Sequence, residues 1–440
     1  MSVISFIHEL TWADLPDTVR NQARRCLLDT LGAALGGRGT ELSRVVYEAA
    51  TAIFGGNDTQ LWLDGRTVSA PGAALAHGMT VDALDIHDGY TLVKGHAGAA
   101  IVPATLATVP KDGDPISGQE LLTSLVVGYE VALRAGLALH ATACDYHTSG
   151  AWNALGCAAV AARRFGLDGE QTRHALGIAE YHGPRSQMMR CIDHPTMVKD
   201  GSGWGALAGV TAAILARGGF TGAPAVTVED GEVEAIWRDL GKRWLILDQY
   251  FKPYAVCRWA QPAITGALAL HRNHQIPLDQ ITEIEVSTFH AATRLASRHP
   301  ATTEEAQYSL PFPVAAALVR GRLGLPELSG AGLADREVLR LAEQVTLIED
   351  PDLTARFPAE RVARVRITLT DGRVFDSGEC QAPWDCAEPP TDDELQEKFR
   401  RLACESPAAA RGEELLTTTW RTDDLPDART LLDLLAAPIA

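Results

Sequence analysis

The sequence predicts a mainly α-helical protein with one large all-helical domain and a smaller α+β domain. Apolar residues recur at helical spacing through most of the first 250 residues. Runs that alternate with the period of a strand occur only after that point. Helix signals return near the C-terminus, so we expect both chain ends to build the helical domain. The predicted boundaries are residues 1–254 and 388–440 for the helical domain and 255–387 for the α+β domain.

The first long helix is predicted over residues 16–38. Ala23, Leu27 and Leu31 recur at helical spacing, and Gly36-Gly37 follows as a stop signal. The later helices share runs of Ala, Leu and Gly, whose small side chains allow close packing. They are predicted at residues 72–84, 103–109, 118–138, 149–165, 169–181 and 202–217.

Strands are predicted in the α+β domain. Residues 281–289 alternate with period two, and residues 345–348 are a second candidate strand. Residues 365–375 form the strongest hairpin pattern in the chain, because an Asp371-Gly372 turn separates two strand-like runs. Between these strands, residues 312–322 predict a helix.

Two helices are predicted after the α+β domain. Thr391 and Glu394 form a capping box, which predicts a helix that continues through Leu402. Residues 431–435 predict a short terminal helix. We expect both helices to pack against the helical domain, which makes that domain discontinuous in the sequence.

The net negative charge of the chain limits the classes of molecule that it is expected to bind. Its 440 residues are enough for two or three domains and a large core. The 39 basic and 56 acidic residues give a net charge of −17, which argues against nucleic acid and anionic membrane surfaces. A local basic pocket can still hold an anionic substrate. The longest near-apolar run, residues 205–216, is too short to span a bilayer.

The N-terminal sequence and the cysteines both predict a cytoplasmic protein. We expect no signal peptide, because residues 1–30 contain Glu9, Asp14 and Asp17 and no apolar core region. The eight cysteines are scattered and form no Cys-x-x-Cys pair. Zinc sites, iron–sulfur clusters and a disulfide scaffold are therefore not expected.

The densest group of acid–base side chains lies between two predicted helices, in residues 85–103. Its members are Asp85, His87, Asp88, Lys94 and His96. Polar loops on a helical scaffold commonly carry catalytic residues. The same His and Asp side chains offer metal ligands as an alternative, but they lack the spacing of a known ligand frame.

Four other segments carry candidate site residues at the ends of predicted elements. They are residues 145–150 with Tyr146 and His147, residues 197–204 with Lys199, residues 251–259 with Lys252, Tyr254, Cys257 and Arg258, and residues 308–312. Each segment also has an ordinary structural explanation, such as a helix cap, a solvated loop or a hinge between domains. A lysine just before a helix, as at Lys199, can hold a carboxylate beside the positive helix end.

Together these segments supply the groups that removal of a proton next to a carboxylate requires. Such carbon acids are very weak, and their enolate-like intermediates need cations or hydrogen-bond donors as well as a base. Nucleotide-binding, zinc-protease and hydrolase motifs are absent from the sequence. The residues therefore fit proton removal next to a carboxylate, and the sequence has no metal or cofactor motif.

The ordered set of segments resembles the MmgE/PrpD family along nearly the full chain. The matching residues are Leu27–Gly32, Leu84-Asp85 with His96 and Pro103, Gly128–Val131 with Arg134, His147–Gly150, Lys199, Gly219 with Gly222, Lys252–Tyr254, and Ser309 with Phe312. The resemblance implies a helical domain built from both chain ends, an α+β lid domain, and a homodimer that needs no metal or cofactor. It also implies a small di- or tricarboxylate substrate that reacts at carbon next to a carboxylate, since the family's activities include 2-methylcitrate dehydration, cis-aconitate decarboxylation and iminodisuccinate epimerisation.

Some positions depart from the pattern of the dehydratase-like and decarboxylase-like members. Their Asp-Asp-Thr turn reads His87-Asp88-Gly89 here. Cys257 stands where the decarboxylases have a histidine, and Phe312 stands where they have a lid tyrosine. These departures favour an epimerase or isomerase similar to iminodisuccinate epimerase, with a dehydratase or decarboxylase as the alternative.

The resemblance and the residue chemistry together predict the roles in the site. The residues that match the family's active site are Asp85, His96, His147, Lys199 and Lys252. His96 and Lys199 are the predicted facing acid–base pair, and His147 and Tyr146 are predicted to assist them. Asp85 is predicted to orient a base or tune its pKa. The predicted substrate-binding residues are Lys252, Arg258, Lys94, Tyr254, Asp88 and Cys257. A catalytically inactive helical dimer and a metal-dependent lyase are two further alternatives.

Overall fold

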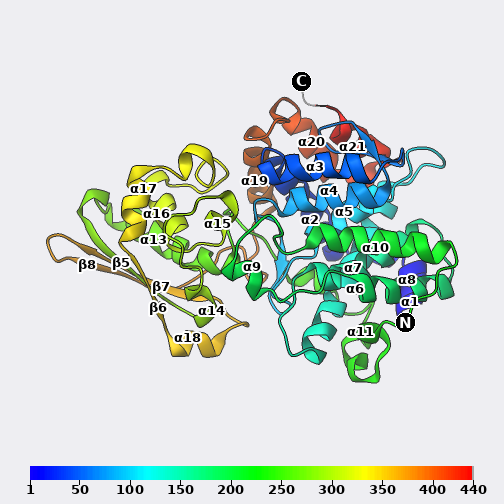
Figure 1. The fold of residues 1–440 in the computed structure, drawn as a ribbon, viewed down its shortest axis with the longest axis horizontal. Coiled ribbons are helices and arrows are strands. Elements are labelled where there is room, and N and C mark those ends of the chain that lie inside the picture. Colours follow the sequence, from blue (N-terminus) through cyan, green and yellow to red (C-terminus); the bar gives the residue numbers. More distant parts are fainter. Residues whose placement is uncertain (439–440) are drawn as a thin grey trace.

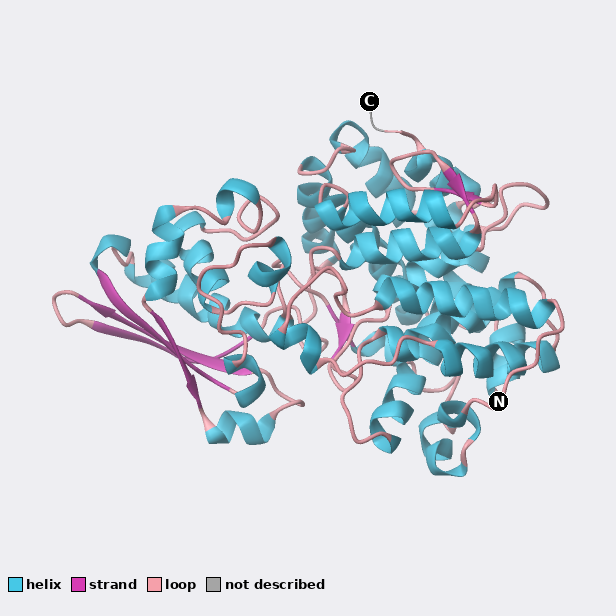
Figure 2. Cartoon of the chain, viewed as in Figure 1, coloured by secondary structure: helices cyan, strands magenta, loops and turns pink. Residues whose placement is uncertain are grey.

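Helices dominate the structure and are arranged in two lobes (Figure 1, Figure 2). The computed structural model of the protein describes residues 1–438. The larger lobe is built of helices, and the smaller lobe contains the main sheet. The predicted mainly α fold class is therefore confirmed, whereas the exact domain boundaries stay a prediction.

The larger lobe contains helices from both ends of the chain. Its elements are α1 (Val3–Glu9), α2 (Asp17–Gly37), α3 (Glu41–Ile53), β1 (Thr59–Gln60), β2 (Thr67–Val68), α4 (Ala70–Asp82), β3 (Gly89–Tyr90), α5 (Gly98–Ala107), α6 (Gly118–Thr142), α7 (Gly150–Arg164), α8 (Gly169–His182), α9 (Met189–Asp193), α10 (Ser202–Arg217), α11 (Val226–Glu229), α12 (Glu234–Trp237), β4 (Gln249–Tyr250), α19 (Asp392–Cys404), α20 (Gly412–Trp420) and α21 (Arg429–Ala436). α19 packs against α2, so a helix near the C-terminus lies beside one near the N-terminus (Figure 1). Thr391 and Glu394 cap α19 reciprocally, as predicted.

Small residues let the central helices of the larger lobe approach closely. α10 packs against both α7 and α4. A Cβ atom on Gly209 would lie 2.4 Å from the carbonyl oxygen of Ala154, which is closer than such contacts allow. The small-residue sequences that predicted these helices therefore also serve their packing.

Helix α6 is long and apolar enough to cross a bilayer by length and composition alone. Two charged residues of opposite sign, Glu130 and Arg134, lie within this helix. Both side chains are buried, with Arg134 Nε 3.6 Å from Glu130 Oε2. The most apolar window of α6 is 94% buried within the protein, which is typical of a core helix.

The smaller lobe is a four-stranded sheet covered by helices. Its elements are α13 (Gln261–His274), β5 (Ile281–Thr288), α14 (His290–Thr293), α15 (Thr303–Gln307), α16 (Pro311–Arg320), α17 (Arg336–Glu343), β6 (Val345–Glu349), α18 (Pro351–Arg356), β7 (Val362–Leu369) and β8 (Val374–Gln381). The strand order is β6-β5-β7-β8, parallel only between β5 and β6. The predicted hairpin is β7–β8, and Gly372 at its turn has the left-handed φ of 84° that favours glycine.

The structure differs from the sequence expectation at α5 and at several helices that were not predicted, among them α1, α3, α17 and α20. α5 begins at Gly98 and not at Pro103, which lies inside the helix. Every residue of α5 is buried, so packing outweighs the usual preference of proline for a first turn. α3 was not predicted, although Thr40 caps its N-terminus.

Candidate active site

Two short strands bring the loop with the acid–base residues against the segment that contains Lys252. β3 pairs antiparallel with β4, with Gly89 opposite Tyr250. A Cβ atom on Gly89 would lie 2.5 Å from Tyr250 Oη and 2.7 Å from His96 Nδ1. A larger residue at position 89 would therefore clash with the side chains of both Tyr250 and His96.

Asp85 and Lys252 form a buried ion pair at the centre of the site. Lys252 Nζ donates to Asp85 Oδ1 at 2.5 Å and to the Asp85 carbonyl oxygen at 2.7 Å. Asp85 has a left-handed backbone conformation, with φ of 48°. Burial raises the pKa of the Asp85 carboxyl, but the charges of Lys252, His96 and Lys199 outweigh burial and hold that pKa below its ordinary value. Asp85 is therefore ionised at neutral pH and balances the charge of Lys252.

His96 lies against this ion pair with one ring nitrogen free to act as a base. Its Nδ1 lies 2.6 Å from the carbonyl oxygen of Asp88, which can only accept a hydrogen bond, so Nδ1 carries the proton. Nε2, which lies 3.8 Å from Asp85 Oδ1, then keeps a lone pair. Burial lowers the pKa of His96 well below its ordinary value, and Lys252 and His87 lower it further. His96 is thus a neutral imidazole, the form that proton removal requires.

The carboxylate of Asp88 faces away from His96. Its Oδ2 accepts from Tyr129 Oη at 2.7 Å, and its Oδ1 accepts from the backbone N–H of Gly98 at 3.2 Å. Burial raises the pKa of Asp88 to about 6. The backbone carbonyl of Asp88 therefore orients His96. The carboxylate of Asp88, which was predicted to bind substrate, is instead engaged by Tyr129 and Gly98.

Ser149 and Asp200, which the sequence analysis did not identify, support His96 from another side. Ser149 Oγ accepts from the backbone N–H of His96 at 2.9 Å and donates to the Asp200 carboxylate. Burial, followed by the charge of Asp82, raises the pKa of Asp200 to about 8. The sequence offered only slight signals for both residues: Ser149 precedes a helix, and Asp200 follows Lys199.

Lys199 approaches the same cluster from the segment before α10. It is buried and has a left-handed backbone, with φ of 50°. Its Nζ donates to Gln307 Oε1 and lies 4.7 Å from the centroid of the Tyr308 ring. Within residues 1–438, no carboxylate forms a salt bridge with Lys199. This ammonium group is therefore available to a substrate carboxylate.

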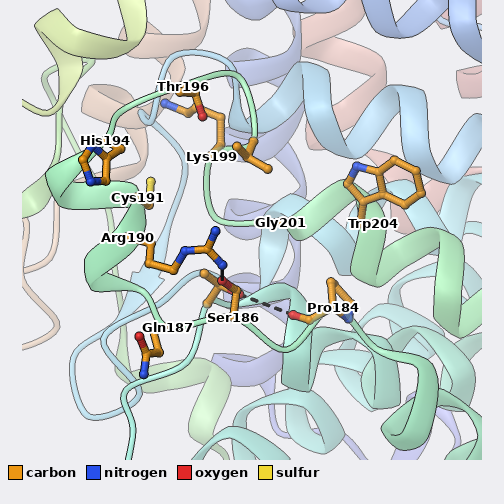
Figure 3. A pocket seen from close by; sticks show the side chains of 12 residues that line it. Pro184, Ser186, Gln187, Arg190, Cys191, His194, Thr196, Lys199, Gly201 and Trp204 are labelled. Carbon is orange, nitrogen blue, oxygen red and sulfur yellow. Dashed lines mark hydrogen bonds between the residues drawn. The ribbon is translucent and has the colours of Figure 1, made fainter.

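Lys199 also lines a cavity of about 420 Å³ (Figure 3). Arg190 and His194 line one side of the cavity, and Trp204 lies on the opposite side. Its volume suits a small molecule. His96 does not line this cavity, whereas Lys199 does. Lys199 therefore links the cavity with the buried cluster around His96.

Tyr146 and Lys94 lie together, whereas His147 turns to its own loop. Tyr146 Oη donates to the carbonyl oxygen of Lys94, and Lys94 Nζ lies 4.0 Å from the centroid of the Tyr146 ring. His147 Nδ1 lies 2.8 Å from the carbonyl oxygen of Asp145. The predicted assistance of Tyr146 and His147 in catalysis stays a prediction, and His147 has no contact with His96 or Lys199 to support it.

The segment that follows Lys252 mostly serves the fold. The Arg258 guanidinium donates to the carbonyl oxygens of Phe251 and Pro383 and pairs with Asp385 at 3.1 Å. Its donors are thus engaged within the protein, which leaves little capacity for the predicted substrate carboxylate. Burial raises the pKa of Cys257 to about 12, so its thiol stays protonated.

Substrate binding by Tyr254 stays a prediction. Burial raises the pKa of Tyr254, and the charges of Arg272, on α13, and Arg401, on α19, offset part of that rise. Of the predicted residues, the structure brings together Asp85, His96, Lys199 and Lys252.

A group of three side chains offers metal ligands in the same loop. The ligand atoms of Asp82, Asp85 and His87 lie within 4.8 Å of one another. His87 Nε2 already lies 3.2 Å from Asp82 Oδ1, and Asp85 is paired with the Lys252 ammonium. An ion at this position would meet a buried positive charge, so these residues fit a metal poorly.

Comparison with known proteins gives the same family for both parts of the chain. Residues 2–236 match the family described as MmgE/PrpD N-terminal domain, and residues 254–422 match MmgE/PrpD C-terminal domain. The chain is 26% identical to the cis-aconitate decarboxylase of Homo sapiens, over 99% of this chain and 94% of that protein. It is 22% identical to the cis-aconitate decarboxylase of Aspergillus terreus, over 97% of this chain and 93% of that protein.

Proposed function

Because the chain belongs to the MmgE/PrpD family, we propose that it is an enzyme that removes a proton from carbon next to a carboxylate of a small di- or tricarboxylate. The observation that carries this proposal is the state of His96. Its protonated Nδ1 is held by a carbonyl oxygen, its Nε2 is free, and its pKa is low. A buried neutral imidazole beside two lysines supports proton removal followed by stabilisation of the resulting negative charge.

Each residue of the cluster has a proposed part in this chemistry. His96 Nε2 takes the proton from the α carbon, and the electron pair of the broken C–H bond moves into the neighbouring carboxylate. Lys199 binds that carboxylate, because its ammonium group has no acidic partner within the described part of the chain. Asp85 and Lys252 hold the loop through their ion pair, and the charge of Lys252 keeps the pKa of His96 low although the charge of Asp85 partly offsets it.

The first finer proposal is a lyase. It is supported by the relatives, which are named cis-aconitate decarboxylases and align over nearly their whole length. In a lyase of this kind, a carbanion next to a carboxylate either expels a β-hydroxyl group or forms when carbon dioxide leaves.

The second finer proposal is an epimerase, which needs a base and a proton donor on opposite faces of one carbon. One support is His96, whose neutral state suits proton removal. The other is that Cys257 and Phe312 offer no acid that could protonate a leaving group. Cys257 holds its proton tightly, and Phe312 is a buried apolar side chain. Lys199 is the proposed proton donor.

The test is to incubate the purified protein with cis-aconitate, 2-methylcitrate, citrate and iminodisuccinate in deuterium oxide and to follow the proton NMR spectrum. New vinyl signals or released carbon dioxide would establish the lyase. Deuterium at an α position without a change of formula would establish the epimerase. An unchanged spectrum with every one of these substrates would contradict the proposed substrate class.

We further propose that the protein is a cytoplasmic homodimer and that the smaller lobe acts as a lid. The family resemblance supports the dimer, and the scattered free cysteines support a reducing compartment. Sedimentation at micromolar concentration would give the oligomeric state, and a monomer would contradict the first part.

A further inference from the structure

A buried arginine outside the predicted site has unused binding capacity. Arg361 lies immediately before β7 and is only 7% exposed. Its Nη2 donates to the carbonyl oxygen of Thr91 at 3.1 Å, but its buried Nε has no hydrogen-bond partner. No carboxylate oxygen lies within 4.0 Å of Arg361 in the range 1–438. Buried guanidinium groups are normally paired with an anion, so Arg361 has the capacity to bind one.

A second cation lies beside Arg361. Lys94 is half-buried and, within the part of the chain that the structure describes, also forms no salt bridge. The carbonyl oxygen of Thr91 accepts both the backbone N–H of Lys94, at 3.2 Å, and Arg361 Nη2. Burial lowers the pKa of Lys94, and the charge of Arg361 lowers it further. Two neighbouring cations without an anion repel each other, and a bound anion would relieve that repulsion.

Tyr250 connects these cations with the proposed base. The Arg361 Cζ atom lies 5.9 Å from the centroid of the Tyr250 ring. The His96 ring lies 6.3 Å from the same ring, nearly perpendicular to it. Arg361 and His96 therefore both lie near the same ring. A second carboxylate, a few bonds from the reacting carbon, can extend past the ring.

We propose that Arg361 and Lys94 form a carboxylate-binding site for the part of the substrate that does not react. The planar guanidinium group suits a bidentate carboxylate, and the lysine adds a point charge. The residues belong to different lobes, so a bound carboxylate would also join the lobes. The identity of the ligand as a polycarboxylate rests on the proposed function, but the anion site itself does not.

The experiment measures binding without turnover. Tricarballylate, a saturated tricarboxylate, is titrated by calorimetry into the full-length protein and its variants. Arg361→Gln should raise the Kd at least about tenfold, which corresponds to about 1.4 kcal/mol. Arg361→Lys should recover part of the affinity, because it keeps the charge but not the planar group. Lys94→Gln, at a half-buried position, should also weaken binding about tenfold.

Arg364→Gln is the matched control. Arg364 lies three residues later, on β7, has a side chain that is 38% exposed and pairs with Glu379 at 3.6 Å, so its loss should leave the Kd unchanged. If Arg361→Gln does not fold, as judged by thermal unfolding, Arg361→Lys and Lys94→Gln carry the test.

The outcomes separate this site from the proposed reaction. Unchanged affinity in the folded Arg361 and Lys94 variants, or no binding by the wild-type protein, would overturn the site. If His96→Ala abolishes turnover while these variants bind normally, the reaction stands and the site fails. If no polycarboxylate is turned over but tricarballylate binds in an Arg361-dependent way, the site stands and the proposed reaction fails.

Discussion

The Nδ1 atom of His96 lies 2.6 Å from the carbonyl oxygen of Asp88, eight residues earlier in the same loop. Because a carbonyl oxygen only accepts, this contact fixes the proton on Nδ1 and leaves the lone pair on Nε2. The backbone of one residue thereby sets the chemical state of another.

The pH dependence of activity should report the low pKa of His96. Burial and then the charges of Lys252 and His87 hold this pKa well below its ordinary value, so the base stays neutral as the pH falls through that value. We expect the acid limb of the kcat/KM profile to have its midpoint below about pH 6.5. A midpoint at or above that value would show that His96 is not the neutral base. His96→Ala should lower kcat by about 10² to 10⁴.

The Asp85–Lys252 pair should show strong coupling in a double-mutant cycle. Lys252→Met leaves the Asp85 carboxylate buried and unpaired, and Asp85→Asn leaves the ammonium in the same position. Each change should lower the free energy of unfolding by about 3–5 kcal/mol, and the double variant should lose less than the sum. Urea denaturation measures all four proteins. Additive losses would contradict the pairing.

An exposed pair on α3 is the control for this cycle. Arg44 and Glu41 are both 60% exposed in their side chains. Arg44→Gln should change the free energy of unfolding by no more than about 1 kcal/mol, because water screens such pairs.

Lys398, on the C-terminal helix α19, should position the catalytic loop without contact to the substrate. Its Nζ donates to Asp29 Oδ1 at 2.5 Å and to the carbonyl oxygen of Ile86 at 2.7 Å. Lys398→Met leaves a buried carboxylate unpaired, and we expect a loss of about 3–5 kcal/mol in unfolding free energy. We also expect a lower kcat, since Ile86 lies between Asp85 and the residues that hold His96.

The control for Lys398 is Arg400→Gln on the same helix, whose exposed side chain pairs with Glu413. It should leave both stability and kcat nearly unchanged. If Lys398→Met is unstable but retains full kcat at low temperature, Lys398 stabilises the fold and does not position the loop.

Asp200 should make the protein less stable as the pH rises. Burial, followed by the charge of Asp82, raises its folded-state pKa to about 8, whereas an unfolded aspartate ionises near about 3.9. Between these values the unfolded chain releases a proton that the folded protein keeps, so rising pH favours unfolding. Asp200→Asn removes this contribution. Its stability relative to the wild-type protein should increase from about pH 4 to about pH 8; a constant difference would contradict the raised pKa.

Chelation should leave the activity unchanged. Asp85 already balances the Lys252 ammonium, and both ring nitrogens of His87 have partners, so Asp82, Asp85 and His87 offer a poor site for a divalent cation. Dialysis against EDTA, followed by assay, checks this prediction. Loss of activity that added divalent metal restores would establish the metal-dependent alternative.

The sequence predicted the helices and the hairpin well because their signals are local. Helical spacing, the Thr391 capping box and the Asp371-Gly372 turn are each contained within a few residues. Helix α3 and the β3–β4 pair were missed for different reasons. α3 has a local signal, the N-cap residue Thr40, that the prediction did not use. β3 and β4 are each two residues long and lie about 160 positions apart in the sequence, so no local pattern reveals their pairing.

Part of the site was predictable because some of its residues have local signals in the sequence. Asp85, His96, Lys199 and Lys252 are charged or basic residues in predicted loops, and they stand at positions that match the family's active site. Gln307 and Arg361 come from the smaller lobe, and only the folded chain brings them near the loop. Arg258 was predicted to bind substrate because of its charge, but the sequence does not reveal that Asp385 and two carbonyl oxygens engage it.

The central claim is that His96 removes a proton next to a carboxylate. The most direct test is the rate of deuterium exchange at the α carbon of the substrate that the protein turns over, measured by NMR in deuterium oxide for the wild type and for His96→Ala. We expect exchange with the wild-type protein and a rate at least about a hundredfold lower with the variant, at similar substrate affinity. Exchange at the wild-type rate in folded His96→Ala would contradict the claim.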